Sequence, residues 1–159
     1  MNKKISVSEF LIKFLSTVFG LGFSPVVPGT MASLAGLLIY LVFIRGNQER
    51  LFIIVGVITA IGFFICGKAE KLFNQKDARP IIIDDFAGML ISLLFLPYSL
   101  TTGILAFLLF RVMDGLKPYP IYKIEHYPGG LGIMLDDILA GVYVNITLQL
   151  LRLTFAILS

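Results

Sequence analysis

The chain has little charge and few of the residues from which most metal and redox sites are built. Only 14% of its 159 residues are charged, against about 25% in an ordinary soluble domain. It contains one histidine, one cysteine and no tryptophan. A disulfide within the chain is therefore excluded, and the usual zinc sites, which need several Cys or His ligands, cannot be assembled. Any metal site must use oxygen ligands, which favours Mg²⁺, Mn²⁺ or Ca²⁺.

Apolar sequence is abundant instead, with 57% hydrophobic residues and a mean hydropathy of +0.92. The length fits a single domain over residues 1–159. Four runs without charge, at 14–44, 51–66, 87–110 and 138–151, are apolar all round rather than amphipathic, which is typical of helices in lipid. We predict an all-α, multi-helix integral membrane bundle with about four membrane-inserted segments. A very hydrophobic soluble helical bundle is the alternative.

The first run is not one helix, because the sequence SPVVPG at residues 24–29 interrupts it. We place the start of the next helix at Thr30, as its N-cap. Two lysines precede the first apolar stretch, as in a signal peptide. Since Glu9 and Lys13 interrupt that stretch and no cleavage site follows, we predict a retained first helix.

The 87–110 run carries Pro97 in its middle, and we predict a helical hairpin with its tip at residues 97–99. The hairpin would place segments 67–86 and 111–137 on the same side as the N-terminus. That side would hold ten of the thirteen Lys and Arg residues. By the positive-inside tendency it is the cytoplasmic side.

Four of the six aspartates form adjacent pairs, Asp84-Asp85 and Asp136-Asp137, each where a polar segment turns into an apolar one. Capping of a helix start accounts for one carboxylate in each pair. It does not account for the second, because adjacent like charges at an apolar boundary repel each other. A bound cation removes that penalty. We therefore predict that the pairs meet at one membrane face and hold Mg²⁺, with capping alone as the alternative.

Arg111, Asp114 and Lys117 are spaced i, i+3, i+6 and share roughly one helical face if the helix persists until Pro118. One interpretation is an exposed row of salt bridges. The other is a carboxylate ligand, Asp114, flanked by two cations that neutralise phosphate oxygens.

Two loops carry weaker signals. Thr30 and Ser33 follow the proline-rich break one turn apart, where their hydroxyls and the free amides of a helix start would suit an anion. A plain helix start without a ligand accounts for them at least as well. Residues 127–132 contain three glycines before the second aspartate pair, which lets the backbone pass close to a ligand. They do not form a Walker loop, since no Gly-Lys-Ser/Thr follows. His126 is interpreted as a phosphate contact or, equally, as an interfacial loop residue, and a general acid ranks below these two.

Four segments together resemble the phosphatidylglycerophosphatase A family. They are residues 20–34 (GLGFSPVVPGTMASL), 84–89 (DDFAGM), 110–120 (FRVMDGLKPYP) and 129–141 (GGLGIMLDDILAG). They occur in the family's order and span nearly the whole chain. One departure is that the family's first pair is often Asp-Glu, where this chain has two aspartates. The shorter carboxylate changes the reach of the ligand but keeps its charge.

The resemblance implies a Mg²⁺-dependent lipid phosphatase that hydrolyses phosphatidylglycerophosphate to phosphatidylglycerol and phosphate in phospholipid biosynthesis. It implies a multi-pass protein of the bacterial cytoplasmic membrane, with the active site facing the cytoplasm. Nucleic acid is not an expected partner, since the basic residues are sparse, and the oligomeric state is open. The candidate catalytic residues are Asp84, Asp85, Asp114 and Asp137; the candidate metal ligands are these four and Asp136; the candidate substrate-binding residues are Thr30, Ser33, Arg111, Lys117 and His126.

Two other functions stay open on the sequence. A CDP-alcohol phosphotransferase also carries aspartates on membrane helices and an Asp-Gly step, as at Asp114-Gly115, but the longer Asp-Gly-x-x-Ala-Arg pattern is missing. A small ion transporter would need acids in the middle of its helices. Here we expect them at helix starts, so the transporter ranks third.

Overall fold

The computed structural model describes residues 6–124 and 126–155, which contain helices and no strand. The all-α class is confirmed. The elements, in chain order, are α1 (Val7–Ser16), a 3-10 turn (Leu21–Phe23), α2 (Pro28–Ile39) with a π-helical extension (Tyr40–Ile44), α3 (Gln48–Phe73), α4 (Ile83–Ser92), α5 (Leu100–Leu116), α6 (Ile121–Ile124) and α7 (Gly130–Phe155).

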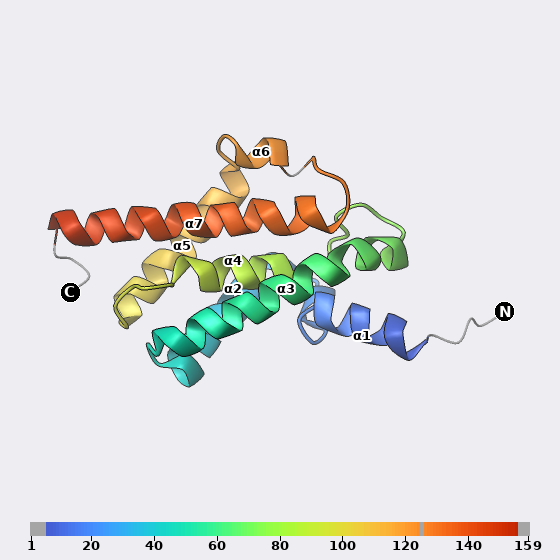
Figure 1. Cartoon of the computed structure of the whole chain (residues 1–159), viewed down its shortest axis with the longest axis horizontal. Coiled ribbons are helices and arrows are strands. Elements are labelled where there is room, and N and C mark those ends of the chain that lie inside the picture. Colours follow the sequence, from blue (N-terminus) through green and yellow to red (C-terminus); the bar gives the residue numbers. More distant parts are fainter. Residues whose placement is uncertain (1–5, 125, 156–159) are drawn as a thin grey trace.

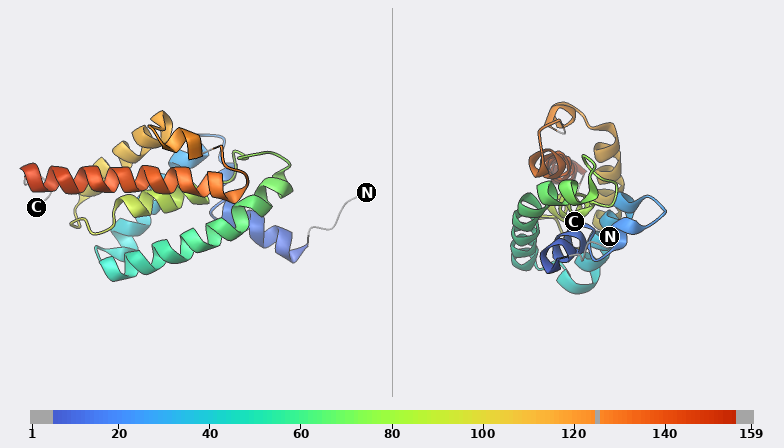
Figure 2. Two further views of the ribbon diagram at one scale, coloured as in Figure 1. Left: turned by 45° about the horizontal axis from the view of Figure 1, so that its top comes forward. Right: turned by 90° about the vertical axis from the view of Figure 1, so that its right-hand side faces the viewer.

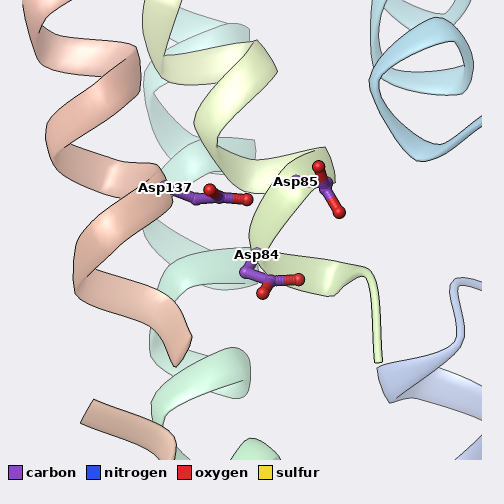
Figure 3. Close-up of side chains that lie close together, drawn as sticks. All are labelled: Asp84, Asp85 and Asp137. Atoms are coloured by element: carbon purple, nitrogen blue, oxygen red, sulfur yellow. The ribbon is translucent and has the colours of Figure 1, made fainter. Parts of the chain in front are cut away.

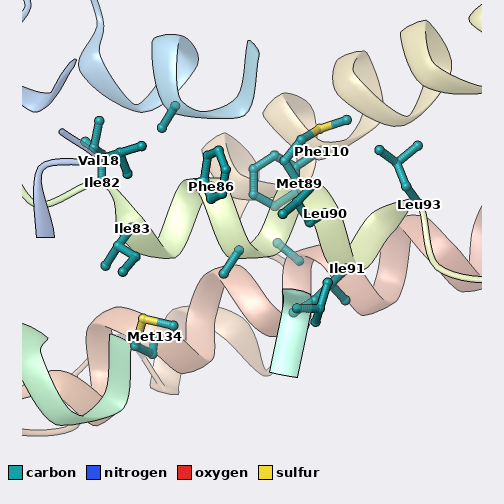
Figure 4. Packing of buried hydrophobic residues seen from close by; sticks show 14 of the residues in the cluster. Val18, Ile82, Ile83, Phe86, Met89, Leu90, Ile91, Leu93, Phe110 and Met134 are labelled. Carbon is teal, nitrogen blue, oxygen red and sulfur yellow. The ribbon is translucent and has the colours of Figure 1, made fainter. Parts of the chain in front are cut away.

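Helix α4 is the centre of the bundle. It packs between α7 on one side and α2 and α3 on the other (Figure 1; Figure 2). Nine of its ten residues are buried. Figure 4 shows Phe86, Met89 and Leu90 of this helix beside Phe110 of α5, with Met134 of α7 below them. A helix of this length owes its stability to such packing rather than to intrinsic propensity, so the packing also fixes the side chains of its first turn.

Helices α4 and α7 approach each other closely at two glycines. A Cβ on Gly141 would overlap the carbonyl oxygen of Gly88, and a Cβ on Gly88 would lie 2.6 Å from the carbonyl oxygen of Asp137. Glycine lets helix backbones approach where any other residue would hold them apart. Each glycine follows an aspartate pair within four residues, so this contact brings the two pairs together.

Replacing Gly141 by Ala is expected to lower the free energy of unfolding by about 1–3 kcal/mol, the usual cost of overpacking. The added Cβ would meet backbone, which cannot move aside as a side chain can. Gly56→Ala on α3 is the matched control, because a Cβ there meets nothing within 4 Å and alanine is the better helix former. Thermal unfolding of both variants in the same detergent measures the difference. Equal unfolding temperatures would contradict the close approach.

The predicted hairpin is confirmed. Helices α4 and α5 are separate and are joined by residues 93–99. Arg111, near the end of α5, pairs with Asp85 at the start of α4. The two helices are therefore antiparallel, and the segments that flank the hairpin meet at one end of the bundle.

Polar side chains from other helices satisfy the backbone of the hairpin turn. The Asn145 amide of α7 donates to the carbonyls of Ser92 and Leu94 at 3.2 and 2.6 Å. The Gln48 amide of α3 donates to the carbonyl of Leu96 at 2.9 Å. Backbone carbonyls that lie outside regular helical hydrogen bonding need such partners when they are buried.

Two helices in the described part of the chain, α3 and α7, are long and apolar enough to cross a membrane. Helix α3 exposes large apolar side chains, among them Phe52 at 60% and Phe64 at 75%. The apolar helix Pro28–Ile44 is shorter. Length and hydropathy thus support two membrane-crossing helices and not clearly the predicted four.

Two helix starts differ from the predicted ones. Helix α2 begins at Pro28, so Thr30 is its third residue rather than its N-cap. Helix α7 begins at Gly130, so the second aspartate pair lies about two turns inside the helix. Gly130 packs tightly on α3, where an added Cβ would lie 2.8 Å from the Gly67 nitrogen. This packing keeps a glycine-rich sequence helical despite its low propensity.

Candidate active site

All six aspartates of the chain line one polar cavity of about 210 Å³. Two pairs come from α4 and α7, one aspartate comes from α5, and one comes from the loop between α3 and α4. Three cations line the same cavity, so its formal charge is negative when every carboxylate is ionised. The charged lining residues are Asp77, Asp84, Asp85, Asp114, Asp136, Asp137, Arg79, Arg111 and Lys117.

Asp84, Asp85 and Asp137 form the carboxylate cluster. Each offers an oxygen, and these oxygens lie within 4.8 Å of one another. Figure 3 shows Asp137 reaching from α7 toward the first turn of α4. Asp84 and Asp137 are only 8% and 4% exposed. Within the described residues, Asp84 Oδ1 is buried without a hydrogen-bond partner, which is costly unless a cation or donor occupies the site.

The carboxylate cluster is poorly compensated by the chain's own cations. Burial raises the pKa of Asp84 well above its usual range, and the neighbouring Asp85 raises it further. Burial also raises the pKa of Asp85 to about 7, with Asp114 adding to the shift and the Arg111 guanidinium opposing it. Without a bound cation the cluster therefore retains protons near neutral pH. A metal ion that bound at these carboxylates would have to displace the protons.

Arg111 links three helices at the edge of the cluster. Its guanidinium pairs with Asp85 of α4 and, at 3.0 Å, with Asp114 on its own helix α5. It also donates to Ser33 Oγ of α2 at 3.2 Å. The predicted salt bridge between residues 111 and 114 is therefore present. Arg111 also forms an ion pair with another helix, inside the cavity. Ser33 supports Arg111 and is not itself among the described residues that line the cavity.

Lys117 joins α5 to α7. Helix α5 ends at Leu116, and Lys117 adopts the left-handed conformation with φ of 43°. Its Nζ lies 2.9 Å from Asp136 Oδ2. The other Asp136 oxygen accepts the Asp137 N–H at 3.0 Å. The second pair is therefore divided: Asp137 belongs to the carboxylate cluster, whereas Asp136 pairs with a lysine.

Besides Ser33, two other predicted substrate-binding residues are not brought into the cavity. Thr30 is absent from its described lining. His126 is exposed in the segment between α6 and α7, with its Nδ1 2.7 Å from the Tyr122 carbonyl oxygen. Of the predicted substrate contacts, Arg111 and Lys117 do line the cavity.

Sequence reasoning missed Gly29, Asp77 and Arg79, which also line the cavity. An added Cβ on Gly29 would lie 2.5 Å from Asp85 Oδ2, so only glycine leaves this carboxylate in place. Gly29 lies in residues 20–34, one of the four segments that resemble the family, and this was the signal that could have identified it. Asp77 and Arg79 lie in a short polar loop without periodicity or pairing, and no pattern marks them.

A helical bundle with buried carboxylates and cations around one polar cavity suits an enzyme that acts on a phosphate ester. The chain belongs to the phosphatidylglycerophosphatase A family, whose model matches residues 14–152. It is accordingly a phosphatase.

Curated relatives agree with this assignment. The phosphatidylglycerophosphatase A of Escherichia coli strain K12 is 39% identical over 132 residues, covering 80% of this chain and 76% of that protein. The Haemophilus influenzae protein of the same name is 37% identical over 147 residues, covering 91% and 90%. A Bacteroides thetaiotaomicron protein described as a candidate phosphatidylinositol-3-phosphatase is 35% identical over 152 residues, covering 91% and 95%. No solved structure shows a significant match.

Proposed function

We propose that this protein is a Mg²⁺-dependent phosphatase that hydrolyses phosphatidylglycerophosphate to phosphatidylglycerol and phosphate at the cytoplasmic face of a bacterial inner membrane. The observation that carries the proposal is the convergence of all six aspartates and three cations on one cavity. Two curated relatives of the chain carry the name phosphatidylglycerophosphatase A, which points to the substrate.

The charge of the cavity supports a metal cofactor. A phosphomonoester is itself an anion, and it would be repelled from a lining in which carboxylates outnumber cations two to one. Asp84, Asp85 and Asp137 would hold the ion, and the buried, unpartnered oxygen of Asp84 fits a hard cation that prefers oxygen ligands. Bound there, Mg²⁺ would supply charge neutralisation at the phosphoryl oxygens.

The chain's own residues would bind and orient the phosphoryl group. Arg111 is held in place by its contacts to Asp85 and Asp114, so its remaining N–H groups can donate to phosphoryl oxygens as negative charge develops. Lys117 adds a second cation at the same cavity. We assign Asp114, whose side chain is 17% exposed, to the orientation of the attacking water.

The apolar surface of the helices supports membrane insertion. Helices α3 and α7 are the two candidate spans, and we propose that the α4–α5 hairpin and the Pro28–Ile44 helix are inserted beside them. Arg45 and Arg50 lie near the end of the bundle opposite to the cavity. The turn of the α4–α5 hairpin lies at the same end. The cavity end carries most of the basic residues, which favours a cytoplasmic site.

Phosphate release from purified protein with Mg²⁺, and without any nucleotide, tests the proposal. We expect release from phosphatidylglycerophosphate in mixed micelles and at least about tenfold less from soluble glycerol phosphate, because the acyl chains localise the substrate. A protein that releases no phosphate without a nucleotide would fit the CDP-alcohol phosphotransferase or transporter alternatives. The transporter alternative regains some weight because Asp136 and Asp137 lie inside α7.

The Bacteroides relative adds a second candidate substrate, phosphatidylinositol 3-phosphate. It shares with phosphatidylglycerophosphate a phosphomonoester carried on the polyol headgroup of a phosphodiester lipid. Including it in the same assay decides between the two headgroups. Faster release from the inositol lipid would replace the proposed substrate while keeping the phosphatase chemistry.

A further inference from the structure

We propose that Arg79 recognises the phosphodiester that links the headgroup to the lipid, and so selects substrates that carry a second phosphate. The inference rests on the proposed function. It assigns a ligand group to a side chain that the sequence patterns did not mark. The starting observation is that Arg79 lines the same cavity as the carboxylate cluster while belonging to a different segment, the loop between α3 and α4.

The three cations of the cavity differ in their partners. Arg111 pairs with two carboxylates, and Lys117 pairs with Asp136. Arg79 instead donates from one terminal nitrogen to the neutral carbonyl of Pro25 at 3.1 Å. A guanidinium has five N–H donors in a planar fork that matches phosphate oxygens. Among the described cations that line the cavity, Arg79 is therefore the one that contacts a neutral group rather than a carboxylate. Its positive charge stays available to a ligand.

The backbone that follows Arg79 is held against the end of α1 and the turn after it. The Ile82 N–H donates to the Ser16 carbonyl at 3.0 Å. The same loop packs so closely on Gly22 that a Cβ there would overlap the carbonyl oxygen of Pro80. The Arg79 side chain is therefore attached to a fixed stretch of backbone, so little backbone entropy is lost when the side chain binds a ligand.

The depth of the charged groups matches the two phosphates of the substrate. Asp84 and Asp137 are buried, whereas Arg79 is exposed at the same cavity. A phosphomonoester bound at the carboxylate cluster with a metal ion would leave the phosphodiester one glycerol unit away, toward the exposed side of the cavity. Arg79 lies on that exposed side and carries the complementary charge.

Three substitutions separate the charge of Arg79 from its contact with Pro25. Arg79→Gln keeps an N–H donor for the Pro25 carbonyl but removes the charge, Arg79→Lys keeps the charge, and Arg79→Ala removes both. For phosphatidylglycerophosphate in mixed micelles with Mg²⁺, we expect Arg79→Gln and Arg79→Ala to raise KM about tenfold, with kcat within about twofold, since a charged hydrogen bond made equally in ground and transition states is lost. Arg79→Lys should recover most of the affinity.

Arg50→Gln is the matched control, because Arg50 also donates its guanidinium to a backbone carbonyl, that of Phe43 at 3.0 Å, outside the cavity. It should leave KM unchanged. Inhibition by phosphatidylglycerol, which keeps the diester but lacks the monoester, gives a second readout. Its inhibition constant should rise about tenfold in Arg79→Gln, whereas a purely structural role would not alter it.

Each other outcome overturns a stated claim. If Arg79→Gln behaves as wild type while Arg79→Ala is impaired, Arg79 only anchors the Pro25 loop and the inference is wrong. A fall in kcat at unchanged KM in Arg79→Gln would place its contact on the reacting phosphate, which also overturns it. Failure of the wild-type protein to release phosphate from phosphatidylglycerophosphate would instead overturn the proposed function.

Discussion

Replacement of Asp137 by Asn is expected to abolish phosphate release while leaving the fold intact. The carboxylate lies in the carboxylate cluster with Asp84 and Asp85, and an amide of the same shape offers a neutral, weaker ligand. Loss of even an outer partner of a metal site costs about 10–100-fold, so we expect a fall of at least about a hundredfold for a direct ligand. The initial rate of release from phosphatidylglycerophosphate measures it.

The same variant should unfold at an equal or higher temperature than the wild type when Mg²⁺ is absent. Asp137 is 4% exposed and faces two other carboxylates, and burial beside like charges disfavours its ionised form, so a neutral amide suits the metal-free site at least as well. Glu49→Gln, which alters an exposed acid at the start of α3, is the control and should change neither quantity. Normal phosphate release by Asp137→Asn would contradict the assignment of Asp137 as a metal ligand. Loss of the folded state would show that its role is structural.

Removal of divalent cations should have an effect of similar size. With EDTA we expect phosphate release to stop, and Mg²⁺ added in excess should restore it. An ion that binds only the folded protein stabilises it by about 2.7 kcal/mol at a hundred times its Kd. The unfolding temperature should therefore rise with Mg²⁺ concentration in the wild type.

Asp84→Asn is the matched variant for this experiment, because it removes the acid whose Oδ1 is buried without a hydrogen-bond partner among the described residues. Its unfolding temperature should respond to Mg²⁺ far less than that of the wild type. Full activity of the wild-type protein in EDTA would contradict the metal dependence. An equal Mg²⁺ response in wild type and Asp84→Asn would move the ion away from this carboxylate.

The elements with strong local signals were predictable from the sequence. Proline at position 97 marked the hairpin, and long uncharged runs marked α3 and α7. The meeting of the aspartate pairs could be inferred because isolated like charges at apolar boundaries need compensation. The convergence of Asp84, Asp85 and Asp137 in the structure agrees with that inference.

Features that depend on tertiary contacts were not predictable. The glycine-rich start of α7 reads as a loop, and only its packing on Gly67 makes it helical. The position of Arg79 at the cavity depends on how distant segments pack, as its contact with Pro25, 54 positions earlier in the chain, shows. For His126 the sequence left a phosphate contact and an interfacial loop residue equally open, and the side chain lies outside the described lining of the cavity.

The close approach at Gly88 and Gly141 also restricts how the sequence can change in length. Glycine follows the first aspartate pair at the third position and the second pair at the fourth, and these spacings set the angle at which each carboxylate leaves its helix. One residue inserted between Asp85 and Gly88 would rotate the pair by about 100° around the axis of α4. Insertions and deletions should therefore be tolerated in the loops but not in these two short intervals, where a length change would point an acid into the apolar core.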